Sequence, residues 1–414
     1  MRIQQIVSIL FALFLLICPF ILVYFHEVWS VFSSIYVIIA VSFIWLSMSL
    51  LFIVDMKKVK ARIMDLTMEY SVVIPCYNES YDTLTQCITS VMDSRGRKQV
   101  IIANDGSTSQ ETKDALITIK NTYGGFIDIL NFEENRGKKF AQIDAIKQCK
   151  YDYCITLDSD TIVEQDTFLK LVNPLKNNEI GLTNVNVKIK NKNKNLMTKM
   201  QELHNYGAFM IGRKSLGGLG IMNCASGIGI GFRKSTFIDF AKEYLDKRPF
   251  GFDCKFGEDR YMTNIMLKNR YKVIMIEDAI AHTFVPETLV SFVKQQLRWK
   301  ISGIIEGIHV LTFSWKTSIT LFIYSLLNIM LPFMCQVVIL TIILSSILSG
   351  EYINLLYFAI VIIMATLVRD TVIILEERRL IKYIVPYSIL NLTVLLWLWW
   401  FALWRIDEKS WITR

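Results

Sequence analysis

The sequence lacks several patterns that mark common classes of protein. None of its eight cysteines forms a C-x-x-C pair or shows the spacing of a zinc site, so we expect reduced thiols in a cytosolic domain. Four histidines are too few for a histidine-based metal cluster. No internal repeat, low-complexity tract or basic-aromatic nucleic-acid module is visible. The net charge of +8 therefore favours lipid headgroups and nucleotide phosphates as partners over nucleic acid.

The N-terminal end of the chain is apolar. Residues 6–24 and 30–54 carry no charge, and each run is long enough to cross a hydrocarbon core of about 30 Å. A cleaved signal peptide is the alternative for the first run, but that run is too long and a second follows at once. The basic cluster at 57–62 predicts that the chain returns to the cytoplasm there.

The chain turns apolar again near its C-terminal end. Residues 318–348 contain Pro332 and form either one long span or a helix pair, and residues 352–375 form another span. The last run, 383–404, is rich in tryptophan and either crosses the bilayer or lies at its surface.

The sequence thus predicts three parts in a multi-pass protein of the plasma membrane. These are two transmembrane helices over 1–54, a cytosolic domain over 55–300 that ends in an interfacial helix, and interfacial and transmembrane helices over 301–414. Within the middle part, short apolar runs alternate with amphipathic stretches, which is typical of an α/β fold with a mostly parallel sheet. We expect strands at 71–75, 99–103, 127–130 and 153–157, and helices at 83–92, 111–121 and 139–148.

Two carboxylates follow the fourth expected strand, where residues 155–161 read I-T-L-D-S-D-T. Side chains two apart on a strand point the same way, so Asp158 and Asp160 are expected to face one site. A hard cation such as Mg²⁺ binds a few carboxylate oxygens and completes its shell with phosphate oxygens. The alternative is a plain polar turn, because D-x-D alone is a common pattern.

Other polar motifs also follow expected strands, where the ligands of α/β sheets gather. Asn78-Glu79 follows the first strand, and Asp105 follows the second, before a glycine that permits close approach. Residues 135–139 (N-R-G-K-K) place three cations at a helix start, which suits a diphosphate. Taken singly, each motif is equally well explained as a turn or a surface patch. The polar, basic stretch 188–199 favours a solvated loop, with lipid headgroups or product as alternative contacts.

Two motifs downstream complete an ordered set. Residues 257–260 (G-E-D-R) supply an acidic pair, and residues 295–299 (Q-Q-L-R-W) place an amide, a guanidinium and an indole on one helix. The set resembles the processive, inverting glycosyltransferases of family 2, which include cellulose, chitin and hyaluronan synthases. It is most similar to bacterial hyaluronan synthases and type 3 pneumococcal capsule synthases. Two departures are Ile412 in the final W-I-T-R, where those synthases have glycine, and A-S-G-I at 225–228, where hyaluronan synthases have C-S-G-P.

The resemblance implies a nucleotide-sugar transferase domain of GT-A type, a UDP-sugar donor, Mg²⁺ or Mn²⁺, and a growing polysaccharide that leaves through the bilayer. It implies that Asp259 is the general base, with Glu258 raising its pKa by repulsion. Asp160 and Asp158 position the metal, and His282 is a candidate third ligand. The residues implied to bind the nucleotide are Tyr77, Asn78, Glu79, Asp105, Lys138 and Arg298. Those implied to bind the acceptor or polymer are Gln295, Gln296, Trp299, Ser226 and Gly227, and the terminal motif adds Trp411 and Arg414.

The polymer that the resemblance favours first is hyaluronan, built from glucuronate and N-acetylglucosamine. A glucuronate–glucose capsule is the second alternative, and a homopolymer of glucose or N-acetylglucosamine is the third. Two other classes stay open: a non-processive transferase that adds one sugar to a lipid phosphate, and an inactive scaffold. The first usually lacks Q-x-x-R-W, and the second is expected to lose a metal carboxylate or the base.

Overall fold

The computed structural model describes residues 65–246, 257–353 and 370–406, with a few isolated residues at 35–42, 355–356 and 366. The two transmembrane helices expected over 1–54, most of the span expected over 352–375, and the terminal residues Trp411 and Arg414 lie outside the described residues.

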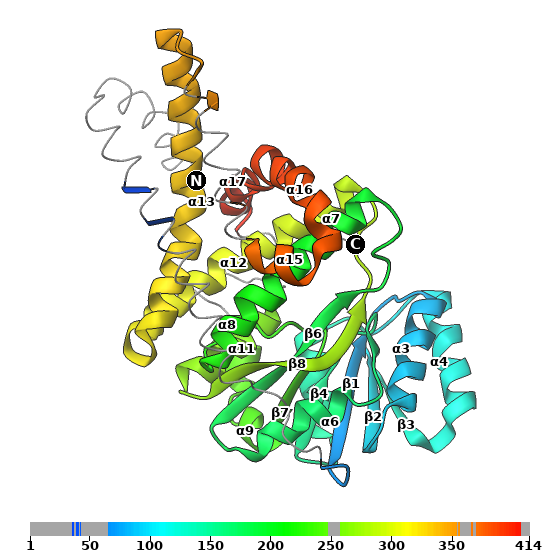
Figure 1. Ribbon diagram of the computed structural model, residues 1–414. Helices are drawn as coiled ribbons and strands as arrows, with labels where there is room; N and C mark the ends of the chain where they lie inside the picture. The colour runs from blue at the N-terminus through cyan, green and yellow to red at the C-terminus, as the bar shows by residue number, and fades with distance from the viewer. Residues whose placement is uncertain are drawn as a thin grey trace.

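A mixed eight-stranded sheet forms the centre of the α/β part of the chain (Figure 1). Its strand order is β3-β2-β1-β4-β7-β6-β8-β5. Neighbouring strands from β3 to β4 are parallel, as are β6 and β8, whereas β7 and β5 run antiparallel to their neighbours. The strands are β1 (Glu69–Cys76), β2 (Arg97–Asn104), β3 (Ile127–Asn131), β4 (Tyr153–Thr156), β5 (Ile162–Val163), β6 (Ile180–Ile189), β7 (Ile230–Arg233) and β8 (Lys272–Thr283).

The predicted α/β class is confirmed. The four expected strands and three expected helices match β1–β4 and α3–α5 to within two residues at each end. The pattern of apolar side chains explains this agreement. Strand β1 is buried at seven successive positions, as expected for a strand that is covered on both faces. The helices are α3 (Tyr81–Asp93), α4 (Gln110–Tyr123), α5 (Lys138–Lys147), α6 (Thr167–Val172), α7 (Leu196–Tyr206), α8 (Lys214–Gly218), α9 (Lys234–Ile238), α10 (Ala241–Leu245) and α11 (Glu258–Lys268), with the π-helix η3 (Gly207–Arg213) and the 3₁₀ turns η1 (Gly124–Phe126) and η2 (Asn173–Lys176).

Local capping and packing position these helices on the sheet. At the start of α3, the Ser80 side chain accepts a hydrogen bond from the backbone N–H of Thr83. The buried face of α3 carries Leu84, Ile88 and Val91, spaced by three or four residues, and these join the sheet core. The six described cysteines are free thiols, and five of them are buried.

The expected domain boundary at residue 300 falls inside one continuous helix, α12 (Leu289–Thr317). The polar Q-Q-L-R-W motif and the apolar residues after it share that helix, so no break separates the two parts. Residues 318–348 form a single helix, α13 (Ile319–Ser349), that continues through Pro332. The remaining C-terminal elements are α15 (Thr371–Glu376), η5 (Arg378–Tyr383), α16 (Ile384–Leu390), η6 (Asn391–Leu395) and α17 (Leu398–Trp404).

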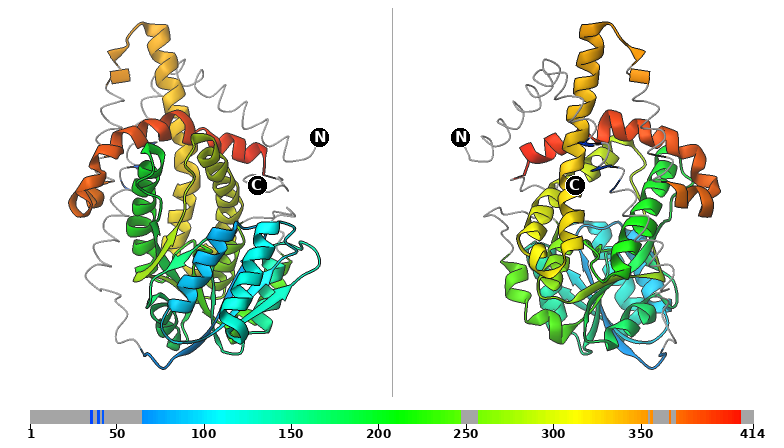
Figure 2. Two further views of the ribbon diagram at one scale, coloured as in Figure 1. Left: turned by 90° about the vertical axis from the view of Figure 1, so that its right-hand side faces the viewer. Right: turned by 60° about the vertical axis from the view of Figure 1, so that its left-hand side comes forward.

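Two helical segments are long and apolar enough to cross a membrane, Ile319–Ser349 and Arg378–Trp404. They run in different directions: α13 projects beyond the domain, while α15–α17 lies crosswise to it over the top of the domain (Figure 2). Apolar contacts hold that crosswise segment, since α16 packs on α7 and Ala402 of α17 packs on α12. This arrangement is compatible with membrane association.

Candidate active site

The polar motifs predicted from the sequence meet where β1, β2 and β4 end. Strand β4 stops at Thr156, so Asp158 and Asp160 lie in a turn closed by a hydrogen bond of 3.2 Å from the N–H of Thr161 to the carbonyl of Asp158. The expected reason for their proximity, alternation along a strand, is therefore wrong. The turn itself brings the two carboxylates together.

A single ammonium group links three of the motifs. Lys138 Nζ lies 2.6 Å from Asp158 Oδ1 and 3.1 Å from Glu258 Oε1. A Cβ placed on Gly227 would lie 3.1 Å from both Lys138 Nζ and Asp158 Oδ1, so the 225–228 loop closes over this pair. Burial by itself would lower the pKa of Lys138, but the two carboxylates hold that pKa well above its ordinary value. Lys138 is therefore a fixed positive charge at the centre of the site.

Asp160 is the carboxylate of the site whose negative charge a bound cation would stabilise most. Burial, together with repulsion from Asp158 and Glu79, raises its pKa to about 7. Among the described residues, no three histidine, cysteine, aspartate or glutamate side chains gather into a group that holds a metal. A few carboxylate oxygens fit Mg²⁺ or Mn²⁺ when phosphate and water complete the shell. Asp160 and Asp158 would be the residues that hold such an ion.

His282 does not join these aspartates. It lies in β8 opposite Ile162 of β5, and its Nε2 is 3.2 Å from Glu164 Oε1. The structure thus gives the predicted third ligand a different neighbour, and its role as a metal ligand stays a prediction without geometric support.

Asp105 organises the loop that carries Lys138. One oxygen of its carboxylate accepts the backbone N–H of Arg136 at 3.0 Å, and the other accepts that of Gly137 at 2.9 Å. The preceding turn needs its glycine, because Gly106 has a φ of 68° and a Cβ there would lie 2.5 Å from the Glu134 backbone. Asp105 was expected to contact a nucleoside directly; in this structure its two oxygens position the 135–138 loop.

The loop after β1 is tied to the loop after β2. Asn78 has a positive φ of 51°, and its Oδ1 accepts the backbone N–H groups of Thr108 and Ser109, each at 2.9 Å. The side chain of Asn78 is therefore structural here. Its neighbour Glu79 lies close enough to Asp160 to raise that residue's pKa. Tyr77 belongs to the same loop, between β1 and α3.

Asp259 sits in the first turn of α11, directly after Gly257 and Glu258. Burial raises its pKa, and repulsion from Glu258 raises it further, in the direction expected from the sequence. Its Oδ1 accepts the N–H of Arg260 at 2.8 Å. A half-buried carboxylate with a raised pKa has the properties of a proton acceptor.

The Q-Q-L-R-W motif lies on α12, which packs directly against α11. One turn beyond the motif, a Cβ on Gly303 would lie 3.7 Å from Arg260 Nη1, next to the candidate base. Trp299 is 44% exposed, so its ring face is available to a ligand. The Oε1 of Gln295 and the Nε2 of Gln296 are buried and have no hydrogen-bond partner in the described part of the chain. Arg298 lies one position before Trp299 on the same helix.

Sequence reasoning missed Arg213, a second cation beside Asp259. Its guanidinium lies 3.9 Å over the Phe209 ring, and burial lowers its pKa, with Arg260 opposing and Asp259 supporting its charge. The sequence feature that could have identified it is the arginine at the end of the otherwise apolar run G-A-F-M-I-G-R. Ser226 lies near the same region, held by Asn184 through its backbone N–H at 3.1 Å.

Comparison with known proteins matches this geometry. Residues 71–237 fit the family described as Glycosyl transferase family 2, and residues 250–414 fit Chitin synthase. The protein is a glycosyltransferase. The first match contains Asp105, Lys138, Asp158 and Asp160, and the second contains Asp259 and the Q-Q-L-R-W motif. As a glycosyltransferase, it uses a nucleotide-sugar donor.

Several known proteins are similar to this glycosyltransferase in sequence or in fold. An N-acetylglucosaminyltransferase of Azorhizobium caulinodans is 26% identical over 365 residues, which cover 87% of this chain and 91% of the relative. One from Mesorhizobium japonicum is 30% identical over 232 residues, about half of each chain (55% and 54%). A solved mannosyltransferase from Pyrobaculum calidifontis, in complex with GDP-Man and Mn²⁺, has a TM-score of 0.61 at 13% identity and covers 88% of this chain and 97% of that one. This last likeness establishes the predicted GT-A fold.

Proposed function

We propose that this glycosyltransferase transfers N-acetylglucosamine from UDP-N-acetylglucosamine and builds a β-linked chain of that sugar. The named relatives are N-acetylglucosaminyltransferases, and the C-terminal part resembles chitin synthase. This support favours the homopolymer alternative over hyaluronan, which the sequence motifs had placed first. The growing chain would leave through the membrane helices, with the catalytic domain at the cytoplasmic face.

The observation that carries the reaction type is the grouping of Lys138, Asp158 and Glu258 beside Asp259. Asp259 would accept the proton of the acceptor hydroxyl as that oxygen attacks the anomeric carbon. A single displacement of this kind inverts the anomeric configuration, so an α-linked donor gives a β-linked product. Lys138 would stabilise the negative charge that develops on the departing UDP.

Other side chains would orient the reactants. The loops that carry Tyr77, Asn78 and Asp105 would enclose the uridine, and Trp299 would offer its ring face to the acceptor sugar. Gln295 and Arg298 would lie toward the diphosphate. A Mg²⁺ or Mn²⁺ ion at Asp160 and Asp158 would supply further positive charge for the leaving group.

The donor sugar is tested with membranes that contain the full chain, Mg²⁺ and labelled UDP-N-acetylglucosamine, UDP-glucuronate and UDP-glucose, singly and in pairs. We expect a chitinase-sensitive product from UDP-N-acetylglucosamine alone. A hyaluronidase-sensitive product that needs glucuronate as well would overturn the proposed sugar. Product size then separates a polymer from the short oligosaccharide or single transfer of a non-processive enzyme.

On acidification, the activity should begin to fall at a higher pH than the ordinary aspartate pKa of about 3.9 would give. Asp259 works as a base only when ionised, and its raised pKa means that protonation begins at a higher pH as the solution is acidified. The measurement is kcat/KM for UDP-N-acetylglucosamine across the acidic and neutral range. Glu258→Gln removes the repelling charge and should move the acid limb to lower pH. An acid limb that stays in place in this variant would contradict the coupling of Glu258 to Asp259.

A further inference from the structure

A second polar cavity lies apart from the Lys138 cluster. It has a volume of about 470 Å³ and is enclosed by the end of β6, α7, β8 and η5. Cavities that bind small molecules commonly have volumes of at least about 300 Å³, so this cavity is large enough to hold a small molecule. Four cationic side chains line it, Lys188, Lys190, Lys192 and Arg379, against two carboxylates, Glu202 and Glu377. With His282 neutral, the lining has a net charge of +2.

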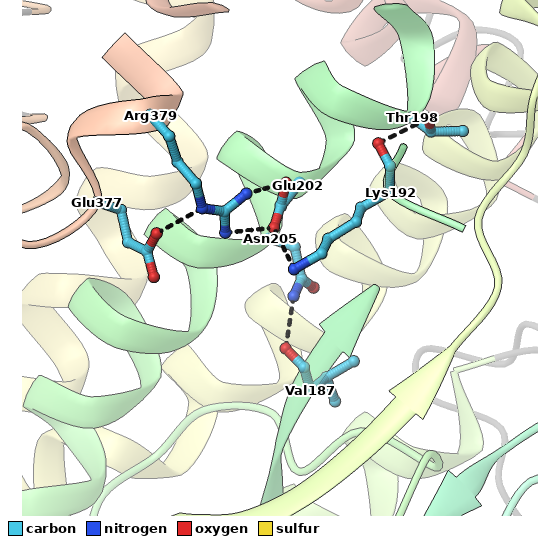
Figure 3. A network of polar contacts seen from close by, with 7 residues as sticks. All are labelled: Val187, Lys192, Thr198, Glu202, Asn205, Glu377 and Arg379. Atoms are coloured by element: carbon cyan, nitrogen blue, oxygen red, sulfur yellow. Dashed lines mark hydrogen bonds and ion pairs between the residues drawn. The ribbon is translucent and has the colours of Figure 1, made fainter. Parts of the chain in front are cut away.

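The two carboxylates are already engaged. Arg379 reaches down from η5 and binds Glu202 through both terminal nitrogens, at 2.9 and 2.7 Å, while its Nε lies 2.9 Å from Glu377 (Figure 3). Lys192 approaches the same Glu202 from the loop after β6, at 3.4 Å (Figure 3). Little carboxylate charge is left for the other lysines.

Lys188 is a cation that this arrangement leaves without a direct ion pair. It is half-buried, and no described carboxylate lies within ion-pair distance of its ammonium. Its Nζ lies 5.5 Å from the centre of the Tyr206 ring, whose hydroxyl donates to Glu376 at 2.5 Å. Burial lowers the pKa of Lys188; attraction to Glu377 and Glu202 opposes this fall, and repulsion from Lys192 and Arg379 adds to it. A half-buried ammonium without a direct ion pair costs free energy that a bound anion would recover.

The walls of the cavity are held in place by further contacts. Asn205 of α7 donates to the carbonyl of Val187 at 2.7 Å, and Thr198 donates to the carbonyl of Lys192 at 3.1 Å (Figure 3). The lysines at 188 and 192 are thus attached to a braced backbone. The expected loop is present over residues 190–195, of which 193–195 are exposed, whereas Lys188 belongs to β6 and residues 196–199 belong to α7.

We propose that this cavity binds a phosphate-bearing anion, with Lys188 and Lys190 as its principal cationic contacts. Lysine binds phosphate as a compact point charge and does not need the two-pronged geometry of arginine. Two sources share this chemistry. One is a soluble diphosphate or nucleotide, since His282 on the cavity wall pairs in the sheet with Ile162, two residues after Asp160. The other is an anionic lipid headgroup, since η5 begins the apolar segment Arg378–Trp404.

This site goes beyond the proposed function, because none of these lysines belongs to the Lys138 cluster and the test measures binding instead of sugar transfer. Detergent-solubilised full-length protein is titrated calorimetrically with pyrophosphate in EDTA, which removes metal-dependent binding at the aspartates. In a parallel arm, the protein is incubated with phosphatidylglycerol or phosphatidylcholine micelles, and the retained lipid is measured.

We expect Lys188→Gln to weaken one of these two ligands about tenfold. Lys188→Arg should retain binding because the charge is kept. Lys194→Gln is the matched control, since Lys194 is exposed on the same stretch and outside the cavity. Loss of pyrophosphate binding identifies a soluble source, and loss of phosphatidylglycerol alone identifies a headgroup source. Equal binding by wild type and Lys188→Gln in both arms, with thermal unfolding showing both folded, would overturn the proposal.

Discussion

Replacing Asp259 with asparagine is expected to lower the rate of sugar transfer by about 10²–10⁴-fold, the usual contribution of a general base. The amide has nearly the same shape as the carboxylate but cannot take the proton of the acceptor hydroxyl. The change also removes a half-buried charge whose pKa burial and Glu258 both raise, so the fold should not suffer. The measurement is the initial rate of UDP release with labelled donor.

A measurement of UDP binding distinguishes loss of the general base from disruption of the nucleotide site. It should persist in Asp259→Asn, because the loops around Asn78 and Asp105 hold each other through backbone contacts that this change does not touch. Asp239→Asn is the control, since Asp239 is an exposed aspartate at the end of α9. A near-normal rate in Asp259→Asn would remove Asp259 from the proposed mechanism.

Replacing Asp160 with asparagine is expected to abolish metal-dependent binding of UDP and to lower turnover by about two to three orders of magnitude. Asp160 lies near both Asp158 and Glu79, so a divalent cation placed there would relieve the repulsion among three carboxylates. The amide keeps the size of the side chain while removing the charge that attracts the ion. The measurement is UDP affinity by calorimetry with and without Mn²⁺.

A second readout distinguishes a metal ligand from a structural residue. Without divalent cations, the ionised form of Asp160 is disfavoured in the folded protein, because its pKa lies above that of an aspartate in the unfolded chain. Removing the charge should then raise Tm at neutral pH. A lower Tm together with unchanged dependence of UDP binding on Mn²⁺ would mean that Asp160 serves the fold and does not hold the ion.

Local patterns were sufficient for much of the fold. The alternation of apolar and amphipathic runs predicted β1–β4 and α3–α5, because each of these elements buries one regular set of its own side chains. Strands β5 to β8 were not predicted. Strand β5 has only two residues, which is too short for a periodic pattern to identify it.

The candidate site likewise contains features that the sequence predicted and features that only the structure revealed. Position after parallel strands grouped Asp105, Asp158 and Asp160 at one edge of the sheet, whereas Asp259 was implied by the resemblance to processive synthases. The motifs did not reveal that Asp105 and Asn78 direct their side chains to backbone N–H groups, since any polar loop residue is compatible with either role. They also placed His282 near the metal, where the structure gives it Glu164.

The sequence by itself determined the α/β class, the apolar C-terminal helices and the residue types available for nucleotide-sugar chemistry, because those properties follow from local order along the chain. Only the tertiary structure decided that Lys138 lies between Asp158 and Glu258, that Arg379 pairs with Glu202, and that Lys188 lines a cavity without a direct ion pair. Such pairings join residues far apart in sequence. Their partners are chosen by how the sheet and the C-terminal helices pack, which no local pattern records.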